Sequence, residues 1–181
     1  MVGVGYDGKR SALAQVAVVN SQGNTVLLEY VIIKEKVTDY RTHVSGITRE
    51  LLVGAKDFET VQKMVHDICH DKILVGHAIN NDLKALMMSH PKTMIRDTAK
   101  YKPLRKYSNG RTPSLRLLAK KILNIQIQTG EHSPAEDAAA TMQIFNLYKV
   151  EWEEYLRKGR GLKNQRLRRQ QKARTASHVE Q

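Results

Sequence analysis

The sequence predicts an α/β domain, because strand-like runs come first and then alternate with helix-like runs. Residues 12–19 and 26–33 are rich in β-branched residues, and the Asn-Ser-Gln-Gly-Asn segment between them has the composition of a hairpin turn. Apolar residues make up 41% and charged residues 27% of the 181 residues, which suits a globular domain with a sizeable core.

The first half of the chain supplies mainly strands. We expect residues 1–4 to be the end of a strand, residues 34–46 to form a polar loop, and Thr48 to cap a short helix over residues 49–53. Apolar residues then recur at spacings of three and one between Val61 and Cys69. This spacing predicts one buried face of a helix that begins near Asp57.

In the second half, short strands are expected at residues 73–75 and 93–96, with a helix over residues 82–88 between them. Thr112, followed by a proline, predicts the cap of a helix that runs through Leu123. Ser133 and Glu136 have the spacing of a capping box, which predicts a long helix through about Leu156, ended by Gly159 and Gly161.

Positive charge is concentrated at the C-terminus. The formal net charge is +12, and residues 157–181 hold nine Lys or Arg and one acid, which leaves +4 for residues 1–156. We therefore expect a domain over residues 1–156 and a basic tail over residues 157–181 that is disordered in isolation. The tail has no apolar face, so its expected partner is a nucleic acid and not a membrane. Such basic clusters also serve as nuclear import signals, so we expect nuclear, and within the nucleus nucleolar, localisation.

The single cysteine, Cys69, excludes an internal disulfide framework and favours a reducing compartment. Its apolar neighbours indicate a small buried hydrophobic residue. No apolar run approaches the roughly 20 residues that a membrane span requires, so we expect a soluble intracellular protein.

Two segments carry candidate chemistry. In the first, Glu-His-Ser-Pro-Ala-Glu-Asp at residues 131–137, a helix start explains Ser133 and Glu136 but not His132 or Asp137. Asp137 precedes three alanines that allow close helix packing, and a carboxylate on such a face needs a partner, for which a metal ion is a frequent choice. In the second segment, a short strand ends at Gly76 and leads through a polar turn to Asp82, where ordinary helix capping is the simpler interpretation.

Taken together, the strand–Gly-His-x3-Asn-Asp turn and the later His-x4-Asp resemble the second and third motifs of the DEDDh 3′–5′ exonucleases, and most closely the RNA exonuclease 4 group. The stretches at residues 8–19, 40–48, 96–98 and 112–119 also read like that group, so the resemblance covers roughly residues 1–150. It implies an RNase H-like fold, with a mixed β-sheet flanked by helices, and 3′–5′ cleavage of RNA in ribosomal RNA processing.

The resemblance also implies site residues. Asp82 and Asp137 fall on two of the four carboxylates that bind two divalent ions, Mg²⁺ or Mn²⁺, and His132 falls on the general base. An imidazole suits that role because it changes charge between pH 5 and 8. Asp97, at the end of a strand, is expected to support its neighbours and not to bind metal.

Four other polar side chains are candidates for contact with substrate, namely His77, Asn81, Arg41 and His43. Ordinary turn hydrogen bonds would account equally well for the first two, and a solvated loop for the other two. The sequence does not separate RNA from DNA as substrate, and it does not fix the oligomeric state.

The chain departs from the family pattern at its start. In the family, an Asp-x-Glu motif stands directly before a Met-Val-Gly-x-Gly stretch, which here is Met1–Gly5. We expect the first central strand to be truncated, metal binding to be impaired, and the 181-residue chain to be weakly active or inactive. The alternative to an exonuclease is a non-catalytic RNA-binding remnant or a ribosome-assembly factor with the same fold.

Overall fold

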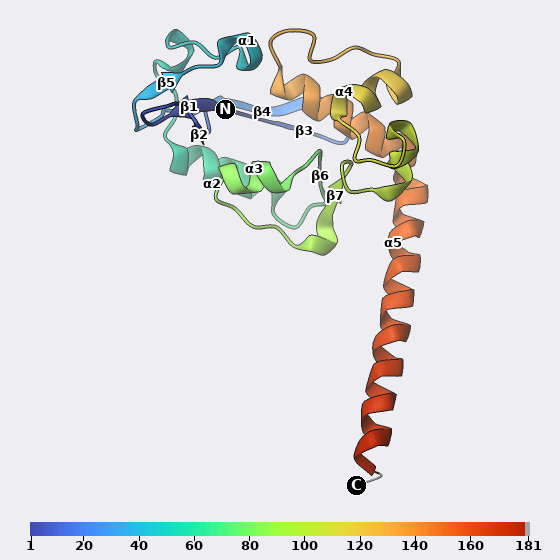
Figure 1. The fold of residues 1–181 in the computed structure, drawn as a ribbon. Helices are drawn as coiled ribbons and strands as arrows, with labels where there is room; N and C mark the ends of the chain where they lie inside the picture. Colours follow the sequence, from blue (N-terminus) through green and yellow to red (C-terminus); the bar gives the residue numbers. More distant parts are fainter. Residues whose placement is uncertain (180–181) are drawn as a thin grey trace. The chain divides into compact units, whose positions relative to one another are not determined.

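The computed structural model describes the backbone of residues 1–179 and the side chains of residues 1–159. The chain divides into two compact units, Met1–Leu147 and Tyr148–Gln181. The first unit contains all the strands, the short helices and the beginning of the last helix (Figure 1). In the described part of the chain, no helix has the length and apolar composition needed to cross a membrane.

The N-terminal strand is buried at the centre of a three-stranded antiparallel sheet. Strand β1 (Val2–Val4) pairs with β2 (Arg10–Ala12) on one side and with β5 (Val37–Asp39) on the other. The prediction that residues 1–4 belong to a strand is confirmed. The predicted polar loop over residues 34–46 is only partly correct, because it also contains β5 and helix α1 (Thr42–Ser45).

The predicted hairpin is confirmed. Strands β3 (Gln15–Val19) and β4 (Thr25–Tyr30) pair antiparallel, and the Asn20 side chain closes the turn by accepting hydrogen bonds from the backbone N–H groups of Gln22 and Asn24, both at 3.0 Å. This side-chain bonding is the reason that asparagine favours such turns.

Helix α2 (Phe58–Cys69) packs its apolar face against the hairpin (Figure 1). Val61 and Val65 are buried with Leu27 of β4, and Cys69 is buried as predicted. Each such side chain contributes about 1.5 to 3 kcal/mol relative to full exposure. The helix starts where the sequence predicts, because the Asp57 carboxylate accepts from Thr60 N at 2.8 Å.

The second half contains a parallel strand pair with a helix between the strands. Strands β6 (Leu74–Gly76) and β7 (Ile95–Asp97) pair in parallel, and helix α3 (Asn80–Ala85) connects them together with a 3₁₀ turn, η2 (Lys92–Met94). In this register Gly76 lies opposite Asp97, so the ends of both strands meet. The turn into α3 and the segment after β7 therefore lie side by side.

The strands form three small sheets, in the orders β2-β1-β5, β3-β4 and β6-β7, and not one continuous mixed sheet. The first two sheets are antiparallel and the third is parallel. The physical reason lies in β1. It is three residues long, and both of its edges are already paired, so it cannot also join the hairpin to the parallel pair.

Two predicted helix starts are wrong. The turn after Thr48 is a 3₁₀ helix, η1 (Glu50–Leu52), whose first turn has no side-chain cap. Helix α4 (Leu115–Leu118) is capped by Ser114, which accepts from Leu117 N at 3.2 Å, and not by Thr112. Both residue types cap helices, so the backbone conformation decided between them. The remaining short elements are the 3₁₀ helix η3 (Lys102–Ser108) and the π-helical η4 (Ala119–Leu123).

Helix α5 (Pro134–Val179) begins where the sequence predicts, since Ser133 Oγ accepts from Glu136 N at 3.4 Å. Within the first unit, it approaches the hairpin turn, where Asn146 Nδ2 donates to Ser21 O at 2.8 Å.

The predicted end of this helix, near Leu156 at Gly159 and Gly161, is wrong, because α5 continues to Val179. Each glycine costs about 1 kcal/mol in a helix, and the surrounding leucine, lysine, arginine and glutamine residues are good helix formers. That residues 157–181 are disordered in isolation stays a prediction. Residues 180 and 181 lie outside the described residues.

Candidate active site

The turn from β6 into α3 places Asp82 in the first turn of the helix. Gly76 makes room for this turn, because a Cβ there would collide with the Ile79 side chain. Ala78 follows with a left-handed backbone, φ 55°, which is costly for a residue other than glycine. Although Asp82 as a residue is exposed, the protein atoms around its carboxyl desolvate it. This burial raises the pKa of Asp82 to about 6, and the charge of Asp97 adds to the rise.

Asp97, at the end of β7, fixes the same turn. Its residue is 5% exposed, and its Oδ1 accepts from Ala78 N at 2.8 Å and from Ala99 N at 3.0 Å. Its Oδ2 is buried without a hydrogen-bond partner and lies 3.5 Å from Lys100 Nζ. The predicted supporting position of Asp97 agrees with these contacts.

His77 interacts with Thr98 and with the charges of two carboxylates. Its Nδ1 is 2.9 Å from the hydroxyl of Thr98, which is buried. Burial lowers the pKa of His77, while the negative charges of Asp97 and Asp137 oppose that effect. His77 is therefore near enough to both carboxylates to interact electrostatically with each.

Asp137 stands in the first turn of α5. Its Oδ2 accepts from Gln128 Nε2 at 2.9 Å, and its Oδ1 is buried without a hydrogen-bond partner. Burial raises the pKa of Asp137, against the opposing effects of the Gln128 hydrogen bond and of the charges on His132 and His77. Asp137 therefore interacts electrostatically with both histidines.

The α1 segment holds the backbone of His132. Its backbone N–H donates to Val44 O at 2.6 Å, and the Glu131 side chain lies beside Gly46. The exposed His43 belongs to the same short helix, so the loop before α5 and the segment that contains His43 lie against each other.

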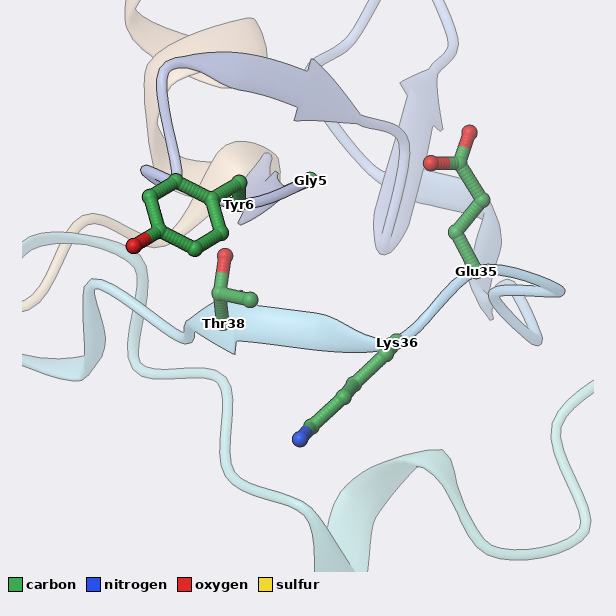
Figure 2. A pocket seen from close by; sticks show the side chains of 5 residues that line it. All are labelled: Gly5, Tyr6, Glu35, Lys36 and Thr38. Carbon is green, nitrogen blue, oxygen red and sulfur yellow. The ribbon is translucent and has the colours of Figure 1, made fainter.

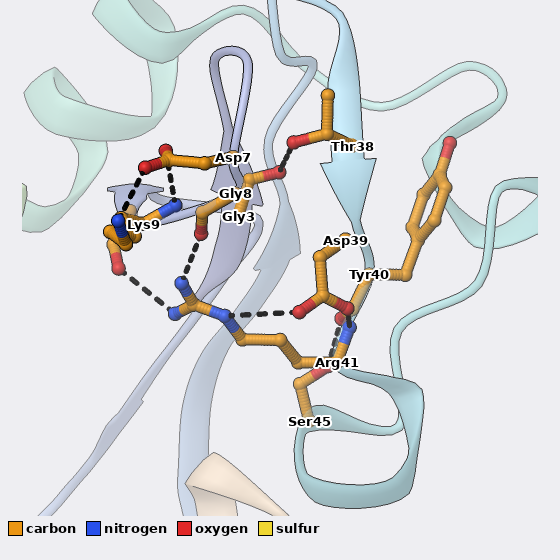
Figure 3. A network of polar contacts seen from close by, with 10 residues as sticks. Gly3, Asp7, Gly8, Lys9, Thr38, Asp39, Tyr40, Arg41 and Ser45 are labelled. Atoms are coloured by element: carbon orange, nitrogen blue, oxygen red, sulfur yellow. Dashed lines mark hydrogen bonds and ion pairs between the residues drawn. The ribbon is translucent and has the colours of Figure 1, made fainter.

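Arg41 belongs to a polar network within the protein (Figure 3). Its guanidinium donates to Gly8 O at 2.7 Å and to Ser11 Oγ at 2.9 Å, and its Nε lies 3.8 Å from Asp39 Oδ2. These bonds tie the β1–β2 hairpin to α1. Contact of Arg41 with a phosphate stays a prediction, as does contact of the exposed Asn81 with substrate.

A surface cavity of about 440 Å³ lies at the β1–β2 turn (Figure 2). The lining residues are Gly5, Tyr6, Glu35, Lys36 and Thr38. Glu35 is paired with Arg10, and none of the candidate catalytic or metal-binding residues lines the cavity. The candidate metal-binding carboxylates, Asp82 and Asp137, therefore lie outside this cavity.

The donor chemistry of the site suits a divalent cation. Carboxylate oxygens are the ligands that Mg²⁺ and Mn²⁺ prefer, and the buried Oδ1 of Asp137 is unpaired. Among the residues that the structure describes, no group of three or more His, Cys, Asp or Glu side chains is arranged to hold a metal ion. The residues present therefore fit part of a metal site.

One contact in this site has no counterpart in the sequence prediction. Gln128 contacts Asp137 from nine residues upstream, across a loop and outside any regular element. Helical and strand periodicities cannot identify such a contact. The only available signal was its position shortly before the His-x4-Asp segment.

Comparison with known proteins assigns the family. Residues 1–145 match the exonuclease family RNase_T. Three relatives, each named RNA exonuclease 4, are 52% identical over 158 residues in Candida glabrata, 51% over 153 in Saccharomyces cerevisiae and 50% over 153 in Xenopus laevis. These alignments cover 87%, 84% and 84% of this chain, but 60%, 53% and 36% of the relatives. The chain thus spans roughly a third to three fifths of the length of these curated relatives.

Solved structures agree on the fold. The pseudoubiquitin hydrolase–RNA exonuclease module of Saccharomyces cerevisiae Pan2, in complex with A7 RNA, is 28% identical with a TM-score of 0.70 over 87% of this chain and 29% of that one. The Neurospora crassa Pan2 catalytic unit is 27% identical with a TM-score of 0.68 over 82% of this chain and 25% of that one. The predicted RNase H-like fold is confirmed, and this chain belongs to the exonuclease family RNase_T.

Proposed function

We propose that this chain is the nuclease domain of a divalent-metal-dependent 3′–5′ exonuclease that acts on RNA in ribosomal RNA processing. The observation that carries the proposal is the buried, unpaired Oδ1 of Asp137 in a carboxylate that interacts with His132. Membership of the exonuclease family and the relatives named RNA exonuclease 4 support the reaction and the substrate class.

Asp82 and Asp137 would hold the metal, two Mg²⁺ or Mn²⁺ ions in a complete site. When bound, such ions stabilise the negative charge that develops on the phosphoryl oxygens. Asp97 holds the Ala78 turn that leads to Asp82, so it positions this carboxylate without needing to bind the metal itself.

His132 would take the proton from the attacking water at a ring nitrogen. The Val44 carbonyl accepts from the backbone N–H of His132 and so holds the residue in place for this role. His77, Asn81, Arg41 and His43 are proposed contacts for the RNA, of which Asn81 and His43 are exposed.

The basic segment 157–181 is proposed to bind the RNA backbone. If about six to nine of its Lys and Arg side chains contact single-stranded phosphates, log Kd should depend on log salt with a slope of about 4 to 6 in magnitude, at ~0.7 per contact. The test is RNA binding at several salt concentrations by the full chain and by a chain ending at Gly159. Equal affinity and slope for the two chains would exclude this role.

The same segment supports a proposed nuclear, and specifically nucleolar, localisation, because basic clusters act as import signals. A fluorescent reporter fused to residues 150–181 should enter the nucleus. A reporter that stays in the cytoplasm would rule out import through this segment.

The second candidate is an RNA-binding protein without catalysis. The observation that favours it is that no group of three or more potential ligands is found among the described residues. If this second candidate is correct, RNA binding should not depend on magnesium. If the chain belongs to an active exonuclease, RNA trimming should require magnesium. The assay below also includes DNA as a substrate.

The decisive experiment is a labelled single-stranded RNA assay with Mg²⁺ or Mn²⁺. We expect the 181-residue chain to be weak or inactive, and a form extended before Met1 with an Asp-x-Glu segment to degrade RNA from its 3′ end. Two further carboxylates would then balance the charge of the ions. With the metal worth several kcal/mol, the difference in rate should be on the order of 10³-fold. Robust 3′ trimming by the 181-residue chain would show that the first motif is not needed. No trimming by the extended form would favour the RNA-binding protein.

A further inference from the structure

Gln128 adopts a backbone conformation that glutamine rarely takes. It lies in the loop between η4 and α5 with φ 57°, in the left-handed region that favours glycine. The residue before it, Ile127, is 1% exposed and anchors the loop in the core. A glutamine in this strained position calls for an explanation in terms of its side chain.

The side chain makes one described contact, to the carboxylate of Asp137. Nε2 donates to Oδ2 at 2.9 Å, while Oδ1 of the same carboxylate is buried and unpaired. The two carboxylate oxygens therefore differ in their contacts. Oδ2 accepts a hydrogen bond from the amide, whereas the lone pairs of Oδ1 are available to another partner.

The chemistry of the donor matters as much as its place. A lysine or arginine would also hold Oδ2, but its positive charge would repel a cation. The glutamine amide is neutral, so it fixes the direction of the carboxylate and leaves its negative charge in place. Hydrogen bonds to carboxylates that bind metals have this orienting effect in metal sites generally.

We propose that Gln128 is a positioning residue that orients Asp137 so that Oδ1 faces the divalent cation. This inference rests on the proposed function, because it needs Asp137 to be a metal ligand. It gives a function to a residue held in a left-handed conformation, whose amide donates to the first turn of α5.

The substitution Gln128→Gly separates positioning from folding. Glycine accepts φ 57° without strain, and this relief opposes the loss of the hydrogen bond to Asp137, so the variant should fold with a melting temperature close to that of the unaltered chain. It lacks the amide, so Asp137 loses its orientation. Gln126→Gly is the matched control, since Gln126 is an exposed glutamine in the same loop. Gln128→Glu is the severe variant, because it replaces the donor by a second negative charge beside Asp137.

The readout is Mn²⁺ binding by the 181-residue chain, followed as paramagnetic broadening of the amide NMR signals of residues 137–140. In this chain and in Gln126→Gly, broadening should appear at the same Mn²⁺ concentration. Gln128→Gly should need about 10- to 100-fold more Mn²⁺, the usual effect of losing a partner that orients a metal ligand. In a form that trims RNA, Gln128→Gly should lower kcat and leave KM for RNA unchanged.

Asp137→Ala distinguishes the two levels of the argument. If Asp137→Ala abolishes the broadening and Gln128→Gly leaves it unchanged, the positioning role is wrong and Asp137 remains a ligand. If Asp137→Ala retains the broadening, or if neither the unaltered chain nor a form extended with an Asp-x-Glu segment shows any, both the positioning role and the proposed metal site are wrong. A fall in melting temperature of Gln128→Gly, with unchanged Mn²⁺ binding, would assign Gln128 a structural role only.

Discussion

The two halves of the candidate site are built in different ways. Around Asp82, the parallel strands β6 and β7 fix the geometry through the backbone: Thr98 N donates to Gly76 O at 2.9 Å, and Asp97 accepts from Ala78 N and Ala99 N. Several buried bonds therefore hold this half, which we call the strand half.

Around Asp137, single contacts from loop residues fix the geometry. Gln128 holds the carboxylate, and the Val44 carbonyl holds His132, while residues 124–126 and 129–131 are exposed. We call this the loop half. From this difference we expect substitutions in the strand half to lower both stability and activity. Substitutions in the loop half should lower mainly activity.

The largest effect should come from the proposed catalytic groups. In a form that trims RNA, His132→Ala, Asp137→Ala and Asp82→Ala should each lower kcat about 10²- to 10⁴-fold, because a general base or a metal ligand is lost. The two loop-half variants should keep the melting temperature of the unaltered chain. The measurement is initial rates of RNA trimming beside thermal unfolding. His90→Ala is a control outside the site and should retain full activity. A loop-half variant that unfolds would contradict the comparison.

An intermediate effect is expected for Asp97→Ala, which removes the central acceptor of the strand half. The N–H groups of Ala78 and Ala99 would lose their partner, and each buried unpaired group costs about 1 to 3 kcal/mol. We expect the free energy of unfolding to fall by roughly 3 kcal/mol in urea denaturation. Asp67→Ala, at an exposed helix position, should leave the free energy of unfolding nearly unchanged, because solvent screens its ion pair with Lys63. Equal losses for the two variants would show that Asp97 does not hold the turn.

Sequence patterns predicted the elements whose causes are local. Asn20 closes the hairpin with its own side chain, and Asp57 caps α2 three residues before its bonding partner. The buried face of α2 follows from spacing alone. Such elements need no knowledge of the rest of the fold.

Elements that depend on distant partners were not predictable in the same way. Strand β5 has three residues and no alternation to detect, and it forms because β1 offers an unpaired edge. The choice of Ser114 over Thr112 as a cap depends on backbone conformation. The arrangement of the strands in three small sheets follows from the short length of β1.

The same division applies to the site. Asp82, Asp137 and His132 became candidates because they stand in short motifs, and their roles stay predictions; the charge of His132 acts on the Asp137 carboxyl. The contact from Gln128 was not predictable, because a left-handed loop residue has no periodic signature. Motifs can suggest candidate reacting groups, whereas contacts made to them from a loop become visible only in three dimensions.

The smallest expected effect is a pH-dependent change in stability from Asp82→Asn. This variant sharpens the comparison because it removes a charge from the strand half and leaves the hydrogen bonds of Asp97 in place. The pKa of Asp82 in the folded chain is about 6, above its ordinary value of 3.8. Between these two values the folded chain binds more protons than the unfolded chain, so stability falls as pH rises through this window.

Asparagine carries no charge to desolvate. Asp82→Asn should therefore match the unaltered chain near pH 4 and be the more stable one at pH 8, by roughly 1 kcal/mol or less because Asp82 is exposed and solvent screens its charge. The measurement is urea denaturation at both pH values in a buffer with chelator. Asp57→Asn is the control of opposite sign: hydrogen bonds from Thr60 lower the pKa of Asp57, so its contribution is present at neutral pH and lost in acid. If Asp82→Asn were less stable than the unaltered chain at pH 8, the Asp82 carboxylate would be a stabilising charge and the desolvation argument would be wrong.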